Sequence, residues 1–234
     1  MELIKKGHTN ISYFDKNQFY QIKTNNGFNH KLDYTMLEIF DFVPKLISNN
    51  EKEIRWEIIQ GNEPELTNEN LVKIAVNMAI LHNSNLKFPA TNHASRIKKY
   101  RQILQEKNIK INVLNDYFRH VNLTLRKMEK STPLHNDLWP FNMIDTGKKI
   151  FFIDWEYASM GDKHFELAYF IECTELDDEK AKIFLDAYGN YDEDFLLRHR
   201  ILVNYLVILW AYSQETLPFD CTKYMQRIRQ LDSI

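Results

Sequence analysis

The sequence has few cysteines and no excess of charge of one sign. Its two cysteines, Cys173 and Cys221, cannot form a disulfide framework and lack metal-ligand spacing, so we expect buried free thiols. Thirty Lys and Arg against 32 Asp and Glu give a formal charge of −2, without the basic excess typical of nucleic-acid binding. The eight His residues form no H-E-x-x-H pair. These absences argue against a disulfide scaffold, a zinc protease and a nucleic-acid partner.

Long apolar segments are also missing. No apolar run approaches the roughly 18 residues that a membrane-spanning helix needs, and residues 1–6 lead into no apolar signal-peptide stretch. The composition, 44% hydrophobic and 26% charged, is that of a globular protein. A chain of 234 residues can form one large domain or two small lobes around a buried core. We therefore expect a cytoplasmic protein without a membrane span.

The hydrophobic pattern changes its period near residue 62. Before that point, alternating stretches predict a hairpin at 11–23 and strands at 42–47 and 54–59, and three- and four-residue spacing predicts a helix at 29–41. Beyond it the period is mostly helical. Helices are expected at about 67–82, 94–107, 112–130, 163–173, 177–188, 192–214 and 219–232, with a polar loop and two short strands between 131 and 154. The pattern predicts an α+β fold with a small antiparallel β lobe, 1–61, and a larger helical lobe, 62–234.

One polar segment carries the sharpest chemical signal. It offers a carboxylate at Asp137, an amide five residues on at Asn142, and a second carboxylate at Asp154 after the predicted hairpin. Phosphoryl transfer from ATP needs this set, because one Asp orients or deprotonates the acceptor hydroxyl while Asn and the second Asp hold Mg²⁺. Asn and Asp are common in turns, so two acidic turns flanking a hairpin are the alternative reading.

The motif H-x-D-x4-N from His135 to Asn142, followed by I-D-W-E-Y-A at 153–158 and G-D-x-x-F-E-L-A at 161–168, resembles the choline/ethanolamine kinase and aminoglycoside phosphotransferase superfamily, and is closest to bacterial choline kinases. That resemblance implies a two-lobed protein-kinase-like fold. It also implies that Asp137 is the catalytic carboxylate, with His135 supporting its loop, and that Asn142, Asp154 and Glu156 form the magnesium site.

The N-terminal segment is similar to the nucleotide-binding part of those kinases. Residues 7–13 resemble their phosphate-covering loop, which implies phosphate contacts from Thr9 and Asn10. Lys23 stands where the family has the base that meets the α- and β-phosphates, and Asp33 where a Glu pairs with that base. The strand that ends at 56–61 resembles the adenine-binding hinge, and its contacts would come from Glu57 and Ile59. The implied cofactors are ATP and Mg²⁺.

Aromatic residues gather around these motifs and favour choline as the small-molecule acceptor. A quaternary ammonium group calls for aromatic faces with one or two carboxylates, whereas an aminoglycoside calls for many Asp and Glu. The predicted substrate-binding residues are Trp139, Tyr157, Glu172 and Trp210. Trp210 also continues an apolar helical stripe, which is equally typical of a core residue.

Two alternatives remain open at this level. The same chemistry can act on ethanolamine, thiamine or an aminoglycoside. A nucleotide-binding pseudokinase or scaffold is the alternative from a different class, because the phosphate loop is poor in Gly and Asp33 and Lys163 depart from the family pattern. ADP release with and without acceptors separates the two.

Overall fold

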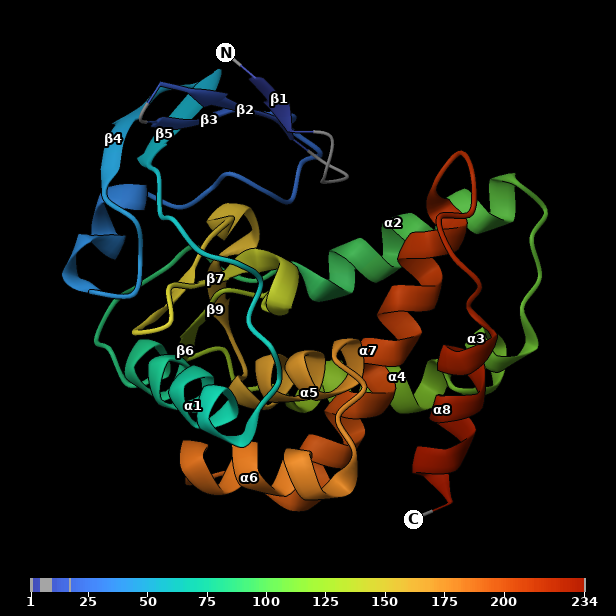
Figure 1. The fold of residues 1–234 in the computed structure, drawn as a ribbon. Helices are drawn as coiled ribbons and strands as arrows, with labels where there is room; N and C mark the ends of the chain where they lie inside the picture. Colours follow the sequence, from blue (N-terminus) through green and yellow to red (C-terminus); the bar gives the residue numbers. More distant parts are fainter. Residues whose placement is uncertain (1, 5–9, 17, 234) are drawn as a thin grey trace. The chain divides into compact units, whose positions relative to one another are not determined.

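The computed structural model describes residues 2–4, 10–16 and 18–233, which fall into two compact units (Figure 1). Unit 1 comprises 1–89, 133–159 and 178–189, and unit 2 comprises 90–132, 160–177 and 190–234. The chain passes between the units within the short strands β6 (Thr132–Leu134) and β9 (Ser159–Gly161). The boundary expected at residue 61 lies inside unit 1, and the division into lobes at that residue stays a prediction.

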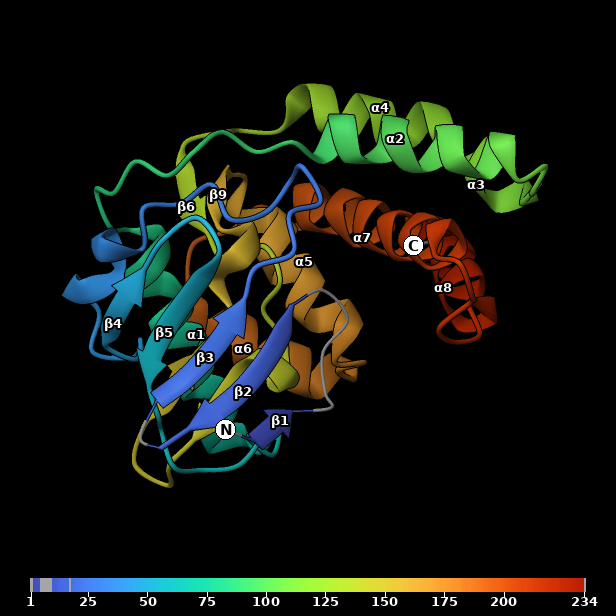
Figure 2. The same cartoon turned by 90° about the horizontal axis from the view of Figure 1, so that it is seen from above.

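Unit 1 contains the predicted N-terminal sheet. Five antiparallel strands run in the order β1-β2-β3-β5-β4, seen side by side in Figure 2. The hairpin expected at 11–23 is confirmed as β2 and β3, paired from Ile11 with Ile22 to Asp15 with Gln18. The strand bounds are β1 Glu2–Ile4, β2 Ile11–Asp15, β3 Gln18–Ile22, β4 Leu46–Asn49 and β5 Glu53–Glu57.

Two elements expected in this region take another form. The helix predicted over 29–41 is only a 3₁₀ helix, η1 (Tyr34–Ile39), because His30 adopts a left-handed conformation (φ 54°) and the Asp33 side chain caps the later start by accepting from Thr35 N. The strand predicted at 42–47 begins later, as β4. Burial rather than periodicity explains the apolar residues before it, since Phe40, Phe42 and Val43 lie in the core.

The segment of unit 1 that carries the predicted catalytic motif includes a short hairpin. The strands β7 (Met143–Asp145) and β8 (Ile150–Phe152) pair Met143 with Phe152, and Gly147 allows the turn with φ 80°. Two helices of this unit pack on one another, α1 (Asn68–His82) and α6 (Asp178–Tyr188). His82 hydrogen-bonds the Tyr188 hydroxyl at 2.8 Å, the structural role expected of a buried histidine.

Unit 2 is helical, with α7 at its centre. The helices α2, α4, α5 and α8 all contact α7. Their bounds are α2 His93–Glu106, α3 Asn112–Asp116, α4 Phe118–Lys127, α5 Lys163–Cys173, α7 Glu193–Ser213 and α8 Thr222–Asp232. The expected segment 112–130 is thus broken at Tyr117 into two helices, which Figure 2 shows with α2 along one edge of the unit.

The helix α7 corrects one expectation from the sequence. Its 21 residues include a window with a mean hydropathy of 1.2, which is long and apolar enough to span a membrane by composition alone. Because 61% of that window is buried inside the protein, the apolar character of α7 is accounted for by its packing in the helical core. Cys221 is fully buried beside this core and Cys173 is half-buried, both as free thiols.

Candidate active site

Asp137 and Asn142 are joined by a pair of hydrogen bonds. The Asn142 side-chain amide donates to the Asp137 backbone carbonyl at 2.8 Å and to its carboxylate Oδ2 at 3.0 Å. The short 3₁₀ helix η2 (Pro140–Asn142), begun by a Pro at its first position, turns the chain so that this amide points back at Asp137. The carboxylate of Asp137 is therefore held in one orientation while part of its surface stays accessible.

Two buried residues before Asp137 support this loop. His135 is 0% exposed and hydrogen-bonds the Ile153 carbonyl through Nε2 at 2.8 Å, with its ring packed on Trp155. Asn136 has φ 67° and donates to Ser159 Oγ at 2.8 Å. His135 is thus fully buried and bound to the Ile153 backbone, and its supporting role for Asp137 stays a prediction.

The β7–β8 hairpin places two of the three expected magnesium-site residues, Asn142 and Asp154, near one another along the backbone. Ile153 N donates to the Asn142 carbonyl at 3.0 Å, which places Asn142 directly beside the residue preceding Asp154. Asp154 is left-handed (φ 60°, ψ 59°), an uncommon conformation for a residue with a side chain, which costs of order 1–3 kcal/mol and is found at functional sites. The surrounding structure therefore holds Asp154 in a strained backbone conformation, which sets the direction of its carboxylate.

Burial and mutual repulsion shift the pKa values of these carboxyl groups. Burial raises the pKa of Asp154 to about 7, the negative charge of Asp137 adds to this, and a hydrogen bond from Gln21 opposes it. Part of the Asp154 surface stays accessible, but protein atoms surround the carboxyl on most sides. Burial, followed by the charge of Asp154, raises the pKa of Glu156 to about 8. A cation bound here would relieve this repulsion.

These residues fit a magnesium ion. Mg²⁺ prefers oxygen ligands and is usually held by one or two carboxylates together with substrate phosphates and waters. Asn142 and Asp154 supply such oxygens, and no Lys or Arg of the described residues forms an ion pair with Asp154. Within the same residues, no group of three or more His, Cys, Asp or Glu forms a self-sufficient metal centre. The nucleotide would complete the ligand set.

Glu156 is held by the N-terminal part of unit 1. Its Oε2 accepts hydrogen bonds from Asn29 Nδ2 at 2.7 Å and from Asn10 Nδ2 at 3.2 Å, and His30 Nε2 lies 3.4 Å away. Asn29, Asn10 and His30 come from segments more than 120 positions away, so no local pattern in the sequence could have linked them to Glu156. Asn29 and His30 are the site residues that the sequence analysis missed.

The structure describes two of the three predicted phosphate-binding residues, Asn10 and Lys23. Asn10 uses its side chain within the protein, donating to Glu156 and accepting from Thr24 N at 3.1 Å, so a nucleotide contact there would use the backbone. Thr9 lies outside the described residues. Lys23 donates through Nζ to Asn49 Oδ1 at 2.5 Å and to the Asn50 carbonyl at 2.7 Å.

The expected pairing of Lys23 with Asp33 does not form among the described residues. Asp33 is exposed and its carboxylate accepts from the backbone N and hydroxyl of Thr35, because it caps η1. With one methylene less than Glu, and committed to this cap, Asp33 does not reach the lysine. The Lys23 ammonium lies 5.5 Å from the Tyr34 ring centroid, and partial burial lowers its pKa.

The segment after β5 offers free backbone where adenine was expected. Glu57 is committed to strand pairing, since its N donates to the Lys45 carbonyl and its Oε1 accepts from Lys45 N at 3.0 Å. Ile59, by contrast, makes no backbone hydrogen bond with any described residue. Three residues on, Asn62 pairs with Asp145 through two backbone hydrogen bonds, which fixes this segment to the β7–β8 hairpin.

Two aromatic side chains follow Asp137 closely in the sequence. Trp139 stacks on Phe141 with ring centroids 5.3 Å apart and an interplanar angle of 26°. Both are half-buried, so part of the pair stays accessible two residues beyond Asp137. The Tyr157 hydroxyl accepts from Asn26 Nδ2 at 2.8 Å, and its ring is half-buried.

Two of the predicted substrate-binding residues belong to unit 2. Trp210 is half-buried on α7 and stacks on Phe219 at 6.1 Å. Glu172 is buried and already neutralised, since its carboxylate binds Arg200 Nε at 2.5 Å and Arg227 Nε at 3.2 Å. It also accepts from Asn204 at 2.8 Å. A carboxylate with two guanidinium partners is not available to a substrate cation, which argues against the expected role of Glu172.

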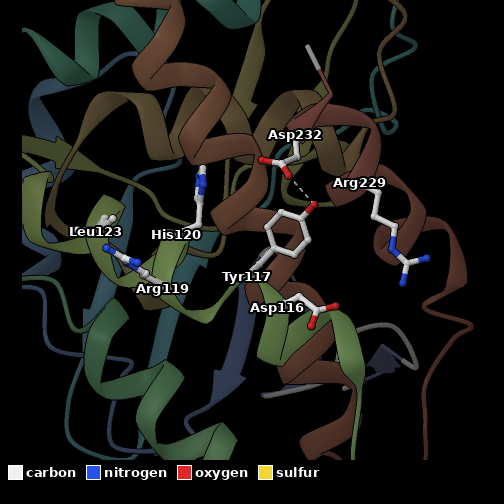
Figure 3. A pocket seen from close by; sticks show the side chains of 7 residues that line it. All are labelled: Asp116, Tyr117, Arg119, His120, Leu123, Arg229 and Asp232. Carbon is white, nitrogen blue, oxygen red and sulfur yellow. Dashed lines mark hydrogen bonds between the residues drawn. The ribbon is translucent and has the colours of Figure 1, made fainter.

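An open cavity of 610 Å³ in unit 2 contains none of the predicted site residues. It is lined by side chains from α3, α4 and α8 and by the intervening Tyr117, whose hydroxyl donates to Asp232 at 2.9 Å (Figure 3). Both acidic and basic groups line it, Asp116 and Asp232 with Arg119 and Arg229. This mixed lining contrasts with the carboxylate cluster of unit 1.

The carboxylate cluster, the loop that carries it and the kinase-like arrangement of sheet and helices define a phosphotransferase. The model of the phosphotransferase enzyme family matches residues 46–198, and the chain belongs to that family. It is 52% identical over 225 residues to a "Protein LicA homolog" of Mycoplasma capricolum, covering 96% of this chain and 94% of the relative.

Solved structures share the fold. A choline/ethanolamine kinase family protein of Mesorhizobium loti superposes with a TM-score of 0.77 at 17% identity, covering 100% of this chain and 87% of that one. The choline kinase LicA of Streptococcus pneumoniae superposes with a TM-score of 0.74 at 20% identity, covering 100% and 94%. The chain is thus an ATP-dependent phosphotransferase with a choline kinase-like fold, as the sequence resemblance predicted.

Proposed function

We propose that the protein transfers the γ-phosphoryl group of ATP to the hydroxyl of choline and so forms phosphocholine. The stacked pair of Trp139 and Phe141, two residues beyond the fixed carboxylate of Asp137, is the observation that carries the choice of acceptor. A trimethylammonium group is attracted to the faces of aromatic rings, most strongly to Trp. The relatives named LicA support the same acceptor.

Asp137 acts on the acceptor hydroxyl. Its carboxylate, held through Oδ2 by the Asn142 amide, would accept the hydroxyl proton, which turns the acceptor oxygen toward the γ-phosphorus. Asn142 and Asp154, with Glu156 next to them, would hold Mg²⁺, which when bound neutralises charge on the phosphates. Most of the acceleration comes from holding the two reactants in line.

The nucleotide would lie along the sheet edge of unit 1. The backbone N–H and carbonyl of Ile59, which pair with none of the described residues, would bind adenine. Lys23 can turn from its two asparagine contacts toward the phosphates, and the loop with Thr9 and Asn10 would cover them with backbone N–H groups. Asp33 and Glu57 have structural partners and take no part in this proposal.

Trp139 and Tyr157, both of unit 1, would form the aromatic part of the acceptor pocket, and the charge of Asp137 would balance the cation. The role of Trp210, which belongs to unit 2, stays a prediction. Glu172 is left out because of its two arginine partners. Soluble substrates and a mostly buried α7 fit a cytoplasmic enzyme. Ethanolamine is the second candidate, since one structural neighbour is described as a choline/ethanolamine kinase family protein.

Substituting Trp139 tests whether choline is the preferred acceptor. With Trp139→Ala, kcat/KM for choline should fall by at least about tenfold more than kcat/KM for ethanolamine, because a primary ammonium depends on hydrogen bonds rather than on ring faces. Leu185→Ala, a change in the buried core on α6, is the control for general damage. Equal losses for both acceptors, or a larger loss for ethanolamine, would remove choline as the preferred acceptor.

A further inference from the structure

The segment 24–33, which joins β3 to η1, is hydrogen-bonded along its length to residues 156 and 157. Asn26 Nδ2 donates to the Tyr157 hydroxyl at 2.8 Å, Asn29 Nδ2 donates to Glu156 Oε2 at 2.7 Å, and His30 N donates to the Glu156 carbonyl at 2.7 Å. These contacts bind both the side chain and the backbone of the segment that follows Asp154. None of these hydrogen bonds is part of strand pairing or internal to a helix, although Glu156 and Tyr157 lie in the short 3₁₀ helix η3 (Trp155–Tyr157).

The contacts are buried and form one network. Asn29 is 1% exposed, and the side chains of His30 and Glu156 are 6% and 4% exposed. Asn29 also donates to the Thr24 carbonyl at 2.8 Å. The His30 ring joins the Tyr34 hydroxyl on one nitrogen to Asn10 Oδ1 on the other, at 2.9 and 3.0 Å.

Two left-handed residues flank this network. His30 (φ 54°) and Asp154 (φ 60°) both carry side chains in a conformation that persists only where surrounding contacts fix it. The hydrogen bond from His30 N to the Glu156 carbonyl lies two residues after Asp154. The backbone that orients the Asp154 carboxylate is therefore fixed from the opposite segment as well as by its own hairpin.

We propose that Asn29 and His30 are positioning residues for the magnesium site. By holding Glu156, they fix the 154–157 backbone so that the Asp154 carboxylate points at the ion. Because the same segment continues from Lys23, it also ties the phosphate-binding strand to the metal-binding loop. The proposal rests on the proposed phosphotransfer site, but it does not depend on which acceptor is used.

Manganese binding tests the assignment without turnover. In Asn29→Asp the amide donor becomes an acceptor facing Glu156, so Mn²⁺ affinity in the presence of ADP, measured by electron paramagnetic resonance, should weaken by about 10- to 100-fold. Asn25→Asp makes the same change at an exposed position four residues earlier and should leave the affinity unchanged. In turnover assays, Asn29→Asp should lower kcat without changing KM for the acceptor.

A reciprocal exchange supplies the decisive comparison. In Asn29→Asp combined with Glu156→Gln, an amide can again donate across the contact, and Mn²⁺ affinity should recover at least in part. If Asn29→Asp does not fold, His30→Asn provides the second test, since Asn tolerates the left-handed backbone but cannot bridge to Tyr34. Unchanged Mn²⁺ affinity in the folded variants, or no recovery in the double variant, would overturn the proposal. If the unmodified protein binds Mn²⁺ with ADP but does not turn over choline, the result would instead count against the proposed acceptor.

Discussion

The side-chain amide of Asn142 reaches back five residues to donate to both the carbonyl and the carboxylate of Asp137, at 2.8 and 3.0 Å. The residue expected to hold the metal thus also fixes the residue expected to act on the acceptor. Metal binding and acceptor orientation are therefore linked through one side chain, and damage to Asn142 should affect both.

Asn142→Asp separates these two roles. The substitution keeps oxygen atoms for the metal but replaces the donor with a carboxylate beside Asp137, so kcat should fall by about 100-fold while the Mg²⁺ concentration for half-maximal rate changes little. Asn83→Asp, at an exposed helix end, is the matched control. Turnover close to that of the unmodified protein would show that the Asn142–Asp137 hydrogen bonds do not matter.

Glu172 is expected to contribute to stability rather than to the substrate site. Glu172→Gln leaves Arg200 and Arg227 without their buried anion and should lower the free energy of unfolding by about 2 kcal/mol, discounted for the partial exposure of both guanidinium groups. Glu175→Gln removes an exposed ion pair and should cost under about 0.5 kcal/mol. Urea titrations measure both. A large rise in KM for choline in a stable Glu172→Gln protein would restore its substrate role.

His199 should make the protein less stable at mildly acid pH. Burial lowers its pKa to about 4 from an ordinary 6.5, against the opposing charge of Asp162, whose Oδ2 lies 3.9 Å from Nε2. The unfolded chain therefore binds the proton more readily, so the free energy of unfolding is undiminished above about pH 6.5 and falls as the pH drops toward 4. A pKa difference of one unit corresponds to about 1.4 kcal/mol, so the shift of His199 lowers the free energy of unfolding by about 3 kcal/mol once the pH is near 4.

The Asp162 carboxylate changes the stability of the protein only in a lower pH range. Burial acts to raise its pKa, but hydrogen bonding from His164 and the nearby His199 outweigh it and lower the value. Stability from this carboxylate is present above its ordinary pKa of 3.8 and is lost only below it. Asp162 therefore adds little to urea titrations between pH 7 and pH 4.5. His30, Asp154 and Glu156 also have shifted pKa values that affect this range, so the difference between the unmodified protein and His199→Gln isolates His199. His199→Gln should flatten the curve over that range, and an unchanged slope would exclude His199 as its source.

Gly61 should be required for nucleotide binding because it fits against the hairpin. A Cβ added there would lie 2.7 Å from Ile144 Cγ2 and closer still to the Asp145 carbonyl oxygen, which is backbone and cannot turn away. Gly61→Ala should therefore displace the segment that includes Ile59 and raise KM for ATP by about tenfold. Gly147→Ala, where φ is 80° but nothing lies within 4 Å, controls for backbone strain. An unchanged KM in Gly61→Ala would argue against the adenine contact.

The sequence was sufficient to predict which residues of one local motif lie near one another. Asp137, Asn142 and Asp154 lie around one hairpin whose turn and alternation are visible in the sequence, and their proximity follows from its register. Asn29 and His30 were not predicted, because their contacts with Glu156 span more than 120 residues and belong to no periodic pattern.

The errors have physical causes of the same kind. Apolar spacing at 29–41 predicted a helix, but those residues fill the core around a short 3₁₀ turn instead. Glu172 was predicted to bind the substrate cation because it is a carboxylate near the motifs. It is instead paired with Arg200 and Arg227, which come from two other helices. Only tertiary structure shows which charges are already paired.

The most direct test is product formation by the purified protein with MgATP and choline. Phosphorus NMR should show phosphocholine appearing in step with ADP, faster than any product from ethanolamine, thiamine or kanamycin. Asp137→Ala should remain folded and lose at least about a thousandfold in kcat. Absence of phosphocholine, or turnover that survives Asp137→Ala, would contradict the account.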